Sequence, residues 1–265
     1  MIEVSIILPT LNEEKNLDFL IPEIQEELTH LNIDNYEIIV VDDGSTDNSK
    51  KLVEQFNNEF KNIYFIERTG EKSLPYSILE GIDNARFSYV MWLDADGSMP
   101  APIVSKLISI QNENLDKVIV GSRFVEGGGY KGIKKGEDTS FLQIISNIYN
   151  SEDSILVVFL SKLFNKLLSK ILKLKVKDLT SGFVIGKKEY FNRESFLNAS
   201  YGDYFIMLML DLNEKKVECL EVPYFCDIRK FGESKTGSNY KQLLKRGLPY
   251  LKLAFKLSRN NGKNN

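Results

Sequence analysis

The sequence predicts an α/β protein built on a mostly parallel sheet with helices on both faces. From residue 4 to residue 121, short and nearly continuous apolar runs alternate with segments whose apolar residues recur at helical spacing. Continuous apolar runs are typical of strands that are buried on both faces, as in parallel sheets. Polar clusters follow these runs directly, where parallel sheets bind their ligands.

The first half of the chain contains strand and helix signals in strict alternation. The run at 4–8 is rich in β-branched residues and stops at Pro9, and the segment after it places apolar residues three and four positions apart. The run at 37–41 reads EIIVV and ends in an Asp-Asp-Gly-Ser turn. The same reasoning predicts strands at 4–8, 37–41, 63–66, 89–93 and 117–121, and helices at 16–31, 47–60, 75–85 and 101–112.

The second half is less regular. A polar loop is expected from Gly127 to about Ser154, and an amphipathic helix over 155–177 carries lysines three and four positions apart in one stripe. This stripe fits a helix lying in a membrane interface with its lysines on phosphate headgroups, and it also fits a core helix with its lysines in water. We expect a main domain over 1–238 and a basic amphipathic helix or tail over 239–265.

The composition is that of a globular protein. Of 265 residues, 43% are hydrophobic and 27% are charged, which excludes a disordered or collagen-like chain. The two cysteines are seven positions apart and lack the spacing of a zinc site or a disulfide framework. We expect no signal peptide and no transmembrane segment. The net charge of −3 conceals a tail that has basic residues and no acids, which fits an anionic partner and equally fits a solvated helix with a frayed end.

Two carboxylates, Asp94 and Asp96, form the sharpest chemical motif. They follow the apolar run that ends at Leu93 and precede a turn marked by Gly97 and Pro100. Mg²⁺ and Mn²⁺ bind through one or two carboxylates together with substrate phosphate oxygens, so a metal–diphosphate site is favoured over a turn with two solvated acids.

Two further clusters follow the first and second strands. In Asp42-Asp43-Gly44-Ser45, one aspartate can cap the next helix while the other accepts hydrogen bonds from a base or ribose. In Pro9-Thr10-Leu11-Asn12-Glu13, Thr10 or Asn12 can be a plain helix cap, and Glu13 can bind a ribose hydroxyl.

Taken together, the motifs resemble the family 2 glycosyltransferases of the GT-A fold. The resemblance rests on the two clusters above, on Asp94-Ala95-Asp96 and on Gly121-Ser122-Arg123-Phe124. Later segments are similar to dolichol-phosphate mannosyltransferases, namely Asp178-Leu179-Thr180-Ser181-Gly182-Phe183, Val222-Pro223-Tyr224-Phe225, Arg229 and Gly232-Glu233-Ser234-Lys235. The resemblance covers about residues 3 to 245 and implies a Rossmann-like GT-A domain over 1–238.

The resemblance also implies which residues form the site. The nucleotide sugar would contact Pro9, Leu11, Glu13, Val41, Asp43, Asp94, Ala95, Asp96 and Arg123. Mg²⁺ or Mn²⁺ would be held by Asp94, Asp96 and Ser98, and the acceptor phosphate by Ser181, Arg229 and Lys235. The catalytic groups would be Asp96, Arg123, Arg229 and Lys235.

The sequence departs from the family pattern in three places. Ser98 replaces a Gln or Ser position near the metal, a change that the site tolerates. Leu11 stands where an aromatic residue usually lies beside the base. The loop over 127–154 is longer than usual and lacks an arginine often found there, with Lys131, Lys134 and Lys135 as substitutes.

The implied reaction is a metal-dependent, inverting transfer of mannose from GDP-mannose to a polyprenyl or dolichyl phosphate. The enzyme would be peripheral on the cytoplasmic face of a membrane, with no nucleic-acid partner and an undetermined oligomeric state. A phosphate acceptor is already anionic at pH 7, so the reaction needs no strong base. That suits a chain whose only histidine, His30, is remote from every motif. The alternatives are transfer from UDP-glucose or another UDP-sugar, a nucleotidyltransferase of α/β fold, and a non-catalytic binding module.

Overall fold

The computed structural model describes residues 2–130, 155–227, 229, 231 and 250. In the first half, strands and helices alternate in the order β1 (Val4–Thr10), α1 (Glu14–His30), β2 (Tyr36–Asp42), α2 (Ser49–Phe60), β3 (Ile63–Glu67), α3 (Leu74–Asn84), β4 (Tyr89–Trp92), α4 (Ala101–Glu113) and β5 (Val118–Ser122). The remaining elements are β6 (Gly129–Tyr130), α6 (Ile155–Leu172), β7 (Val184–Lys187), a 3₁₀ turn (Lys188–Tyr190), α7 (Glu194–Leu197), α8 (Asp203–Glu214), β8 (Cys219–Pro223) and β9 (Phe225–Cys226).

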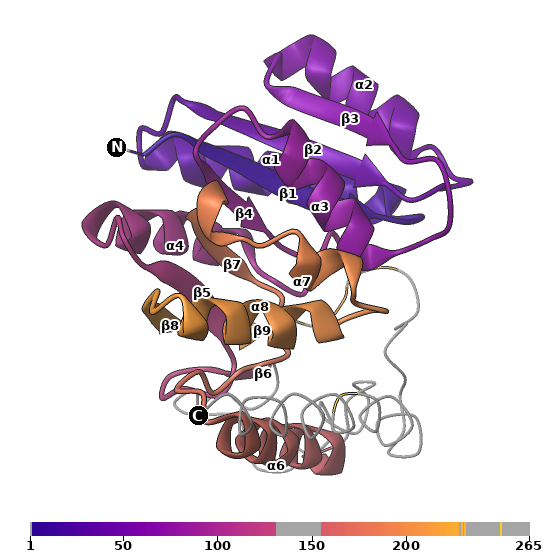
Figure 1. Cartoon of the computed structure of the whole chain (residues 1–265). Coiled ribbons are helices and arrows are strands. Elements are labelled where there is room, and N and C mark those ends of the chain that lie inside the picture. Colours follow the sequence, from indigo (N-terminus) through magenta and orange to yellow (C-terminus); the bar gives the residue numbers. More distant parts are fainter. Residues whose placement is uncertain (1, 131–154, 228, 230, 232–249, 251–265) are drawn as a thin grey trace, which may run out of the picture.

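The described strands form a twisted seven-stranded sheet in the order β3-β2-β1-β4-β7-β5-β8 (Figure 1). Six of these strands run parallel, while β7 runs antiparallel between β4 and β5, with Met91 opposite Ile185. The amino end of β7 therefore lies at the edge where the parallel strands have their carboxyl ends. A small second sheet pairs β6 with β9 beyond that edge.

Helices cover both faces of the sheet, and each face has its own apolar core. Alternate residues of β1 enter opposite cores: Ile6 packs on the side of α1 and α4, and Ile7 packs on the side of α3 and α8. Gly81 of α3 allows a close approach to β1, because a Cβ at this position would lie 2.4 Å from Cγ2 of Ile7. The strands are thus buried on both faces, as their continuous apolar runs predicted.

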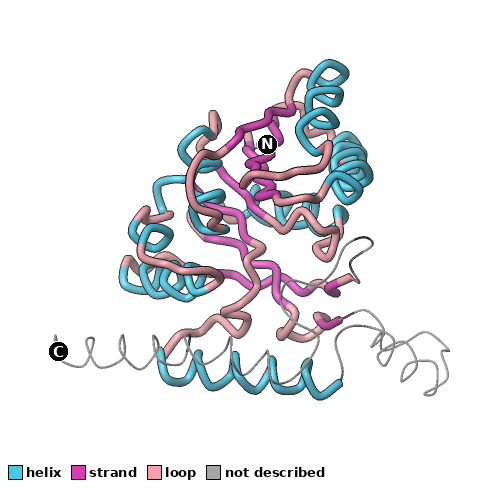
Figure 2. The backbone as a smooth tube through the Cα atoms, turned by 90° about the vertical axis from the view of Figure 1, so that its right-hand side faces the viewer, coloured by secondary structure: helices cyan, strands magenta, loops and turns pink. Residues whose placement is uncertain are grey.

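Helix α6 lies at one end of the molecule, apart from the central sheet (Figures 1 and 2). Its buried side contributes Leu168 and Leu172 to the α8-side core. The helix ends at Leu172, earlier than the expected boundary at residue 177, because Lys173 has a left-handed φ of 54°. Backbone bonds from Lys173 N to Lys170 O and from Leu174 N to Ser169 O close this end.

The sequence-based fold prediction is confirmed, with shifts at element ends. All five expected strands and four expected helices are present in the first half; α1 begins two residues before the expected helix, and β5 begins and ends one residue late. The expected loop from Gly127 is partly wrong, because Gly129 and Tyr130 pair with β9. The rest of that loop, 131–154, and the tail over 239–265, Tyr250 excepted, lie outside the described residues.

Candidate active site

The acidic pair occupies the turn that follows β4. Asp96 is 7% exposed, and its Oδ1 accepts a 2.9 Å hydrogen bond from the backbone N of Ser98. Gly97 has a φ of 76°, and a Cβ there would lie 2.7 Å from the ring of Phe19, so the turn requires glycine. The turn therefore fixes the direction of the Asp96 carboxylate.

Asp94 carries an electrostatic cost in this position. Burial, and then the neighbouring Asp96 carboxylate, raise the pKa of Asp94 to about 7. Two carboxylates that share a half-buried place resist being ionised together. The pair is therefore arranged to accept positive charge.

Arg229 supplies positive charge from the far end of the chain. Its Nη2 lies 2.5 Å from Oδ2 of Asp96, and its Nη1 lies 4.0 Å from Oε1 of Glu13. Burial opposes the charged guanidinium, but the carboxylates, Asp96 foremost, raise the pKa of Arg229 above its usual value. A 2.8 Å bond from Asp227 N to Ser98 O fastens the segment leading to Arg229 onto the acidic turn. Arg229 thus lies beside the acidic pair, and its role toward phosphates stays a prediction.

Glu13, just past β1, faces the same centre. It is 8% exposed, and its Oε2 accepts a 2.6 Å bond from Nδ2 of Asn16. The same amide donates to the backbone O of Phe231 at 3.2 Å. Asn16 thus joins the start of α1 to the segment that carries Arg229, and it is a site residue that the sequence reasoning missed.

The end of β2 forms a second polar wall. Asp43 is bound by the guanidinium of Arg68, and it accepts a 2.5 Å bond from the backbone N of Ser73. Asp42 closes its own turn by accepting bonds from the backbone N of Gly44 at 3.0 Å and of Ser45 at 2.8 Å. The expected helix cap is wrong, because Asp42 closes its own turn instead of capping α2. Asp43 forms an ion pair with Arg68, a partner that the sequence analysis did not identify. A contact of Asp43 with a base or ribose stays a prediction.

Asp47 takes the helix-start role at α2. Its Oδ1 accepts bonds from the backbone N and the hydroxyl of Ser49, at 3.1 and 2.6 Å. Burial acts against the carboxylate, but these bonds and one from Glu14 N lower the pKa of Asp47. Near β1, Leu11 is half-buried and Val41 is fully buried.

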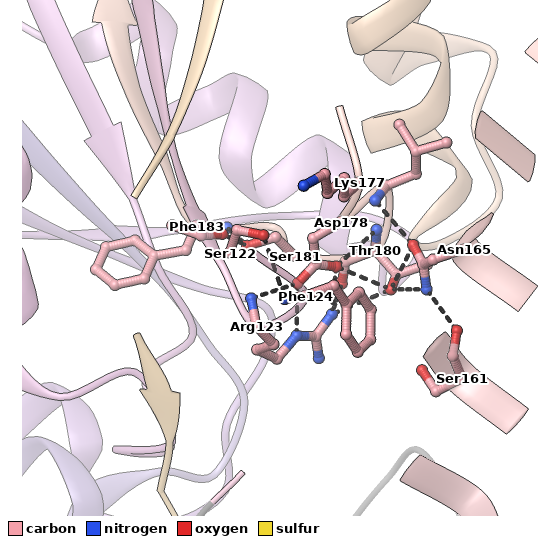
Figure 3. A network of polar contacts seen from close by, with 12 residues as sticks. Ser122, Arg123, Phe124, Ser161, Asn165, Lys177, Asp178, Thr180, Ser181 and Phe183 are labelled. Atoms are coloured by element: carbon pink, nitrogen blue, oxygen red, sulfur yellow. Dashed lines mark hydrogen bonds and ion pairs between the residues drawn. The ribbon is translucent and has the colours of Figure 1, made fainter. Parts of the chain in front are cut away.

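Arg123, just past β5, is held by a buried carboxylate (Figure 3). Asp178 is fully buried and receives Nε and Nη2 of Arg123, each at 2.8 Å. Burial opposes its charge, but Asp178 raises the pKa of Arg123 above its usual value. Nη2 also donates to the backbone O and the hydroxyl of Thr180, at 2.9 and 3.0 Å. The guanidinium is thus oriented by the segment that precedes β7.

Ser181 lies beside this pair, with its hydroxyl turned inward. Its Oγ donates to the backbone O of Gly121 and accepts a 3.2 Å bond from the backbone N of Phe183. It is 4% exposed. In this arrangement Ser181 holds the segment against β5, and a contact with an acceptor phosphate would require that hydroxyl to turn.

Most of the predicted site residues converge on one edge of the sheet. They are Pro9, Leu11, Glu13, Val41, Asp43, Asp94, Ala95, Asp96, Ser98, Arg123, Ser181 and Arg229, which lie at or just beyond the carboxyl ends of β1, β2, β4 and β5, before β7 and after β9. Lys235, also predicted, lies outside the described residues, as do Lys131, Lys134 and Lys135. His30 ends α1, which returns to the opposite edge.

The acidic pair fits a divalent cation bound partly by substrate. In the described part of the chain, no three His, Cys, Asp or Glu side chains form a closed cluster for a metal. Mg²⁺ typically takes one or two carboxylates and completes its shell with phosphate and water oxygens. Asp94 and Asp96 provide two, and the raised pKa of Asp94 marks negative charge that lacks full compensation.

The fold and this site define a GT-A glycosyltransferase, a class that carries its site at the carboxyl edge of such a sheet. Residues 5–194 match the family described as glycosyl transferase family 2, and the chain belongs to that family. The chain is 31% identical over 233 residues to a dolichol-phosphate mannosyltransferase of Pyrococcus furiosus, an alignment that covers 88% of this chain and 59% of that protein. The chain thus spans about three fifths of the length of that relative.

Two other comparisons extend the likeness. The chain is 29% identical over 227 residues to an uncharacterized protein of Methanocaldococcus jannaschii, covering 82% of this chain and 87% of that one. The solved glucosyl-3-phosphoglycerate synthase of Mycobacterium tuberculosis, in complex with UDP, matches with a TM-score of 0.60 at 14% identity over 97% of this chain and 80% of its own. Crystals of that synthase contain UDP with Mn²⁺ or with Mg²⁺. At this identity, the likeness concerns the fold.

The raised pKa of Asp94 predicts a pH-dependent stability change in Asp94→Asn. The folded protein holds the Asp94 proton up to about pH 7, whereas the unfolded chain releases it near pH 4. The cost of ionising Asp94 in the fold therefore grows from about pH 4 to about pH 7. In EDTA, urea unfolding should show Asp94→Asn more stable than the wild type by about 4 kcal/mol at pH 8, and no more stable at pH 4.

Asp34→Asn is the control, because Asp34 is exposed in the loop before β2. This variant should follow the wild type at both pH values. A stability difference for Asp94→Asn that does not change with pH would show that Asp94 is not held in a strained carboxylate pair.

Proposed function

We propose that this glycosyltransferase moves mannose from GDP-mannose to a polyprenyl or dolichyl phosphate, with inversion and with Mg²⁺ or Mn²⁺. The observation that carries the proposal is the meeting of Arg229 with Asp96 and Glu13 at the edge that also holds Asp94. Alternating acids and arginines suit a site that brings two phosphate-bearing substrates together. The likeness to a dolichol-phosphate mannosyltransferase over 88% of the chain supports this choice of donor and acceptor.

The two substrates divide the site between them. The nucleoside of the donor would lie against Pro9, Leu11, Glu13, Val41 and Asp43, and its diphosphate against Asp94, Ala95, Asp96 and Arg123. Asp94, Asp96 and Ser98 would hold a divalent cation, which would supply neutralising charge for the leaving diphosphate. The acceptor phosphate would approach Ser181, Arg229 and Lys235, with Arg123 between it and the donor diphosphate.

The chemistry needs orientation and charge compensation more than proton removal. An oxygen of the acceptor phosphate forms a bond to the anomeric carbon, while the bond from that carbon to the diphosphate breaks and GDP leaves. The acceptor oxygen is already anionic, so no side chain has to take a proton. Arg229 and Arg123 keep two anionic groups in one place, where such contacts are strongest when water is excluded.

A UDP-sugar such as UDP-glucose is the second candidate donor. The structural likeness to a UDP-bound synthase makes this alternative worth testing, although 14% identity speaks only for the fold. Membership of glycosyl transferase family 2 removes the nucleotidyltransferase alternative.

We further propose that the enzyme works as a peripheral protein on the cytoplasmic face of a membrane. On α6, Leu163 and Leu167 are 52% and 45% exposed, and the neighbouring Lys162, Lys166 and Lys170 are exposed as well. A surface with exposed leucines between lysines suits the boundary between acyl chains and anionic headgroups. Within the described residues, no helix has the length and apolarity to cross a membrane.

The transfer reaction predicts a labelled lipid product. The protein is incubated with Mg²⁺ or Mn²⁺, a polyprenyl phosphate and either labelled GDP-mannose or labelled UDP-glucose, and the lipid is extracted. GDP-mannose should label the lipid, and EDTA or Asp96→Asn should abolish the labelling because the diphosphate loses its counter-charge. If only UDP-glucose labels the lipid, the donor is UDP-glucose and not GDP-mannose. If neither donor labels the lipid, the proposal of a polyprenyl phosphate acceptor is wrong.

Arg229 predicts a large rate loss for a charge-conserving change. A guanidinium gives a planar, two-pronged contact that an ammonium cannot reproduce. Arg229→Lys should raise the barrier by about 2–4 kcal/mol, a rate loss of about 30- to 1000-fold, at an unchanged melting temperature. The matched control is Arg193→Lys, because Arg193 pairs with Asp83 in an exposed ion pair. Equal rates for the two variants would remove Arg229 from the site.

The surface of α6 predicts vesicle binding that depends on lipid charge. Each lysine near an anionic surface contributes about 1 kcal/mol, and the exposed leucines add apolar burial. The protein should sediment with phosphatidylcholine vesicles only when they contain phosphatidylglycerol, and less so as salt increases. Leu163→Ser with Leu167→Ser should weaken binding, whereas Leu115→Ser with Leu197→Ser, at leucines 48% and 41% exposed elsewhere, should not. Equal binding to neutral vesicles would contradict the proposal.

A further inference from the structure

A buried amide joins α6 to the segment that precedes β7. Asn165 is 1% exposed although it lies on an amphipathic helix. Its Oδ1 accepts a 2.8 Å bond from the backbone N of Leu179, and its Nδ2 donates to the backbone O of Ser161 at 3.0 Å and to the hydroxyl of Thr180 at 3.1 Å (Figure 3). One side chain thus satisfies backbone groups on two separate segments.

Two backbone groups determine which way this amide faces. The N–H of Leu179 can only donate, so the atom opposite it must be the amide oxygen. The carbonyl of Ser161 can only accept, so the atom opposite it must be the amide nitrogen. The amide nitrogen is therefore the atom that faces the Thr180 hydroxyl, and this assignment follows from the bonding partners themselves.

The Thr180 hydroxyl connects the Asn165 amide to the guanidinium of Arg123. Its oxygen accepts from Nδ2 of Asn165 at 3.1 Å and from Nη2 of Arg123 at 3.0 Å. With both acceptor positions filled, the hydroxyl hydrogen can donate to Oδ1 of Asp178, 3.3 Å away, or to Oδ1 of Asn165, 3.4 Å away. The hydroxyl therefore bridges the amide, the guanidinium and the carboxylate.

The position of residues Leu179 and Thr180 depends on this bridge, because the neighbouring anchors lie on either side of them. Glu221 of β8 holds the backbone N of Lys177 and of Asp178, at 2.9 and 3.0 Å. On the other side, Ser181 is bonded to β5. Between these two anchors, the described bonds from Leu179 N and the Thr180 hydroxyl lead to Asn165 and to the Arg123–Asp178 pair.

We propose that Asn165 is a positioning residue, which orients Arg123 toward the phosphates of donor and acceptor through the hydroxyl of Thr180. The proposal rests on the proposed function for the identity of these two substrates. It makes α6 part of the reaction centre: the helix that presents leucines and lysines at the surface also sets the direction of the guanidinium. Asn165 touches no substrate and acts through Thr180 and Arg123.

The first test compares two buried amides that are replaced by the same apolar residue. In Asn165→Leu the bridge is lost. In the control, Gln111→Leu, a fully buried amide at the end of α4 loses its bonds to Asn114 O and Lys117 O, at the opposite edge of the sheet. Both variants should melt earlier than the wild type. Only Asn165→Leu should raise KM for a short-chain polyprenyl phosphate by about tenfold and weaken binding of the nucleoside diphosphate, with kcat within about threefold.

The second test follows the guanidinium itself and needs no turnover. In ¹⁵N-resolved NMR spectra, Nε–H of Arg123 should give a slowly exchanging signal because it donates to the buried Asp178. Asn165→Leu and Thr180→Val should speed its exchange with water by about tenfold or more, because the guanidinium then opens more often. Thr180→Ser keeps the hydroxyl and should restore both the slow exchange and the acceptor KM.

The two tests separate this proposal from the proposed function. If the wild type transfers no sugar to a polyprenyl phosphate, the proposed function fails, and the exchange rate of Arg123 Nε–H alone decides the positioning role. An exchange rate that is the same in Asn165→Leu as in Gln111→Leu would overturn the proposal. So would an acceptor KM that rises equally in both variants.

Discussion

Negative charge gathered at the carboxyl edge of the sheet is the constraint on which the rest of the site depends. A buried carboxylate is costly unless a cation or hydrogen-bond donors meet it. Three aspartates at this edge are met by three arginines: Asp43 by Arg68, Asp96 by Arg229 and Asp178 by Arg123. Asp94 is the exception: Arg229 and Arg123 act on it, but burial and Asp96 outweigh them and raise its pKa, so its charge is only partly compensated. The least compensated aspartate of the set is therefore the one best placed to bind a cation brought by a substrate.

The reversed strand β7 makes this arrangement possible. Because β7 runs against β4 and β5, the residues before it arrive at the edge where the parallel strands end. Asp178, Thr180 and Ser181 are thereby set beside Arg123 at the end of β5. A parallel strand in the same place would have carried these residues to the opposite edge. The antiparallel direction of β7 thus adds the residues before it to a site that is otherwise formed by the ends of β1, β2 and β4.

Helix α6 has one face at the protein surface and one face packed against the rest of the protein. One presents Leu163 and Leu167 between lysines at the surface, and the other buries Leu168 in the core and Asn165 against the segment before β7. A lipid acceptor would bring its phosphate and its apolar chain to the same side of the protein. A helix that meets both the surface and the Arg123 network suits such a substrate, because its position governs both contacts.

The sequence by itself determined the sheet of the first half and the edge where the site lies. Continuous apolar runs can be buried only between two layers, and polar residues such as Asp94, Asp96 and Asp43 came directly after them. Only the tertiary structure decided the pairing. Arg68 lies 25 positions from Asp43, Arg123 lies 55 from Asp178, and Arg229 lies 133 from Asp96, and no periodicity marks such partners. The direction of β7 was likewise undetermined, because a strand of four residues reads the same way in either sense. Local patterns specify which residues are buried, whereas strand order in space specifies which charges meet.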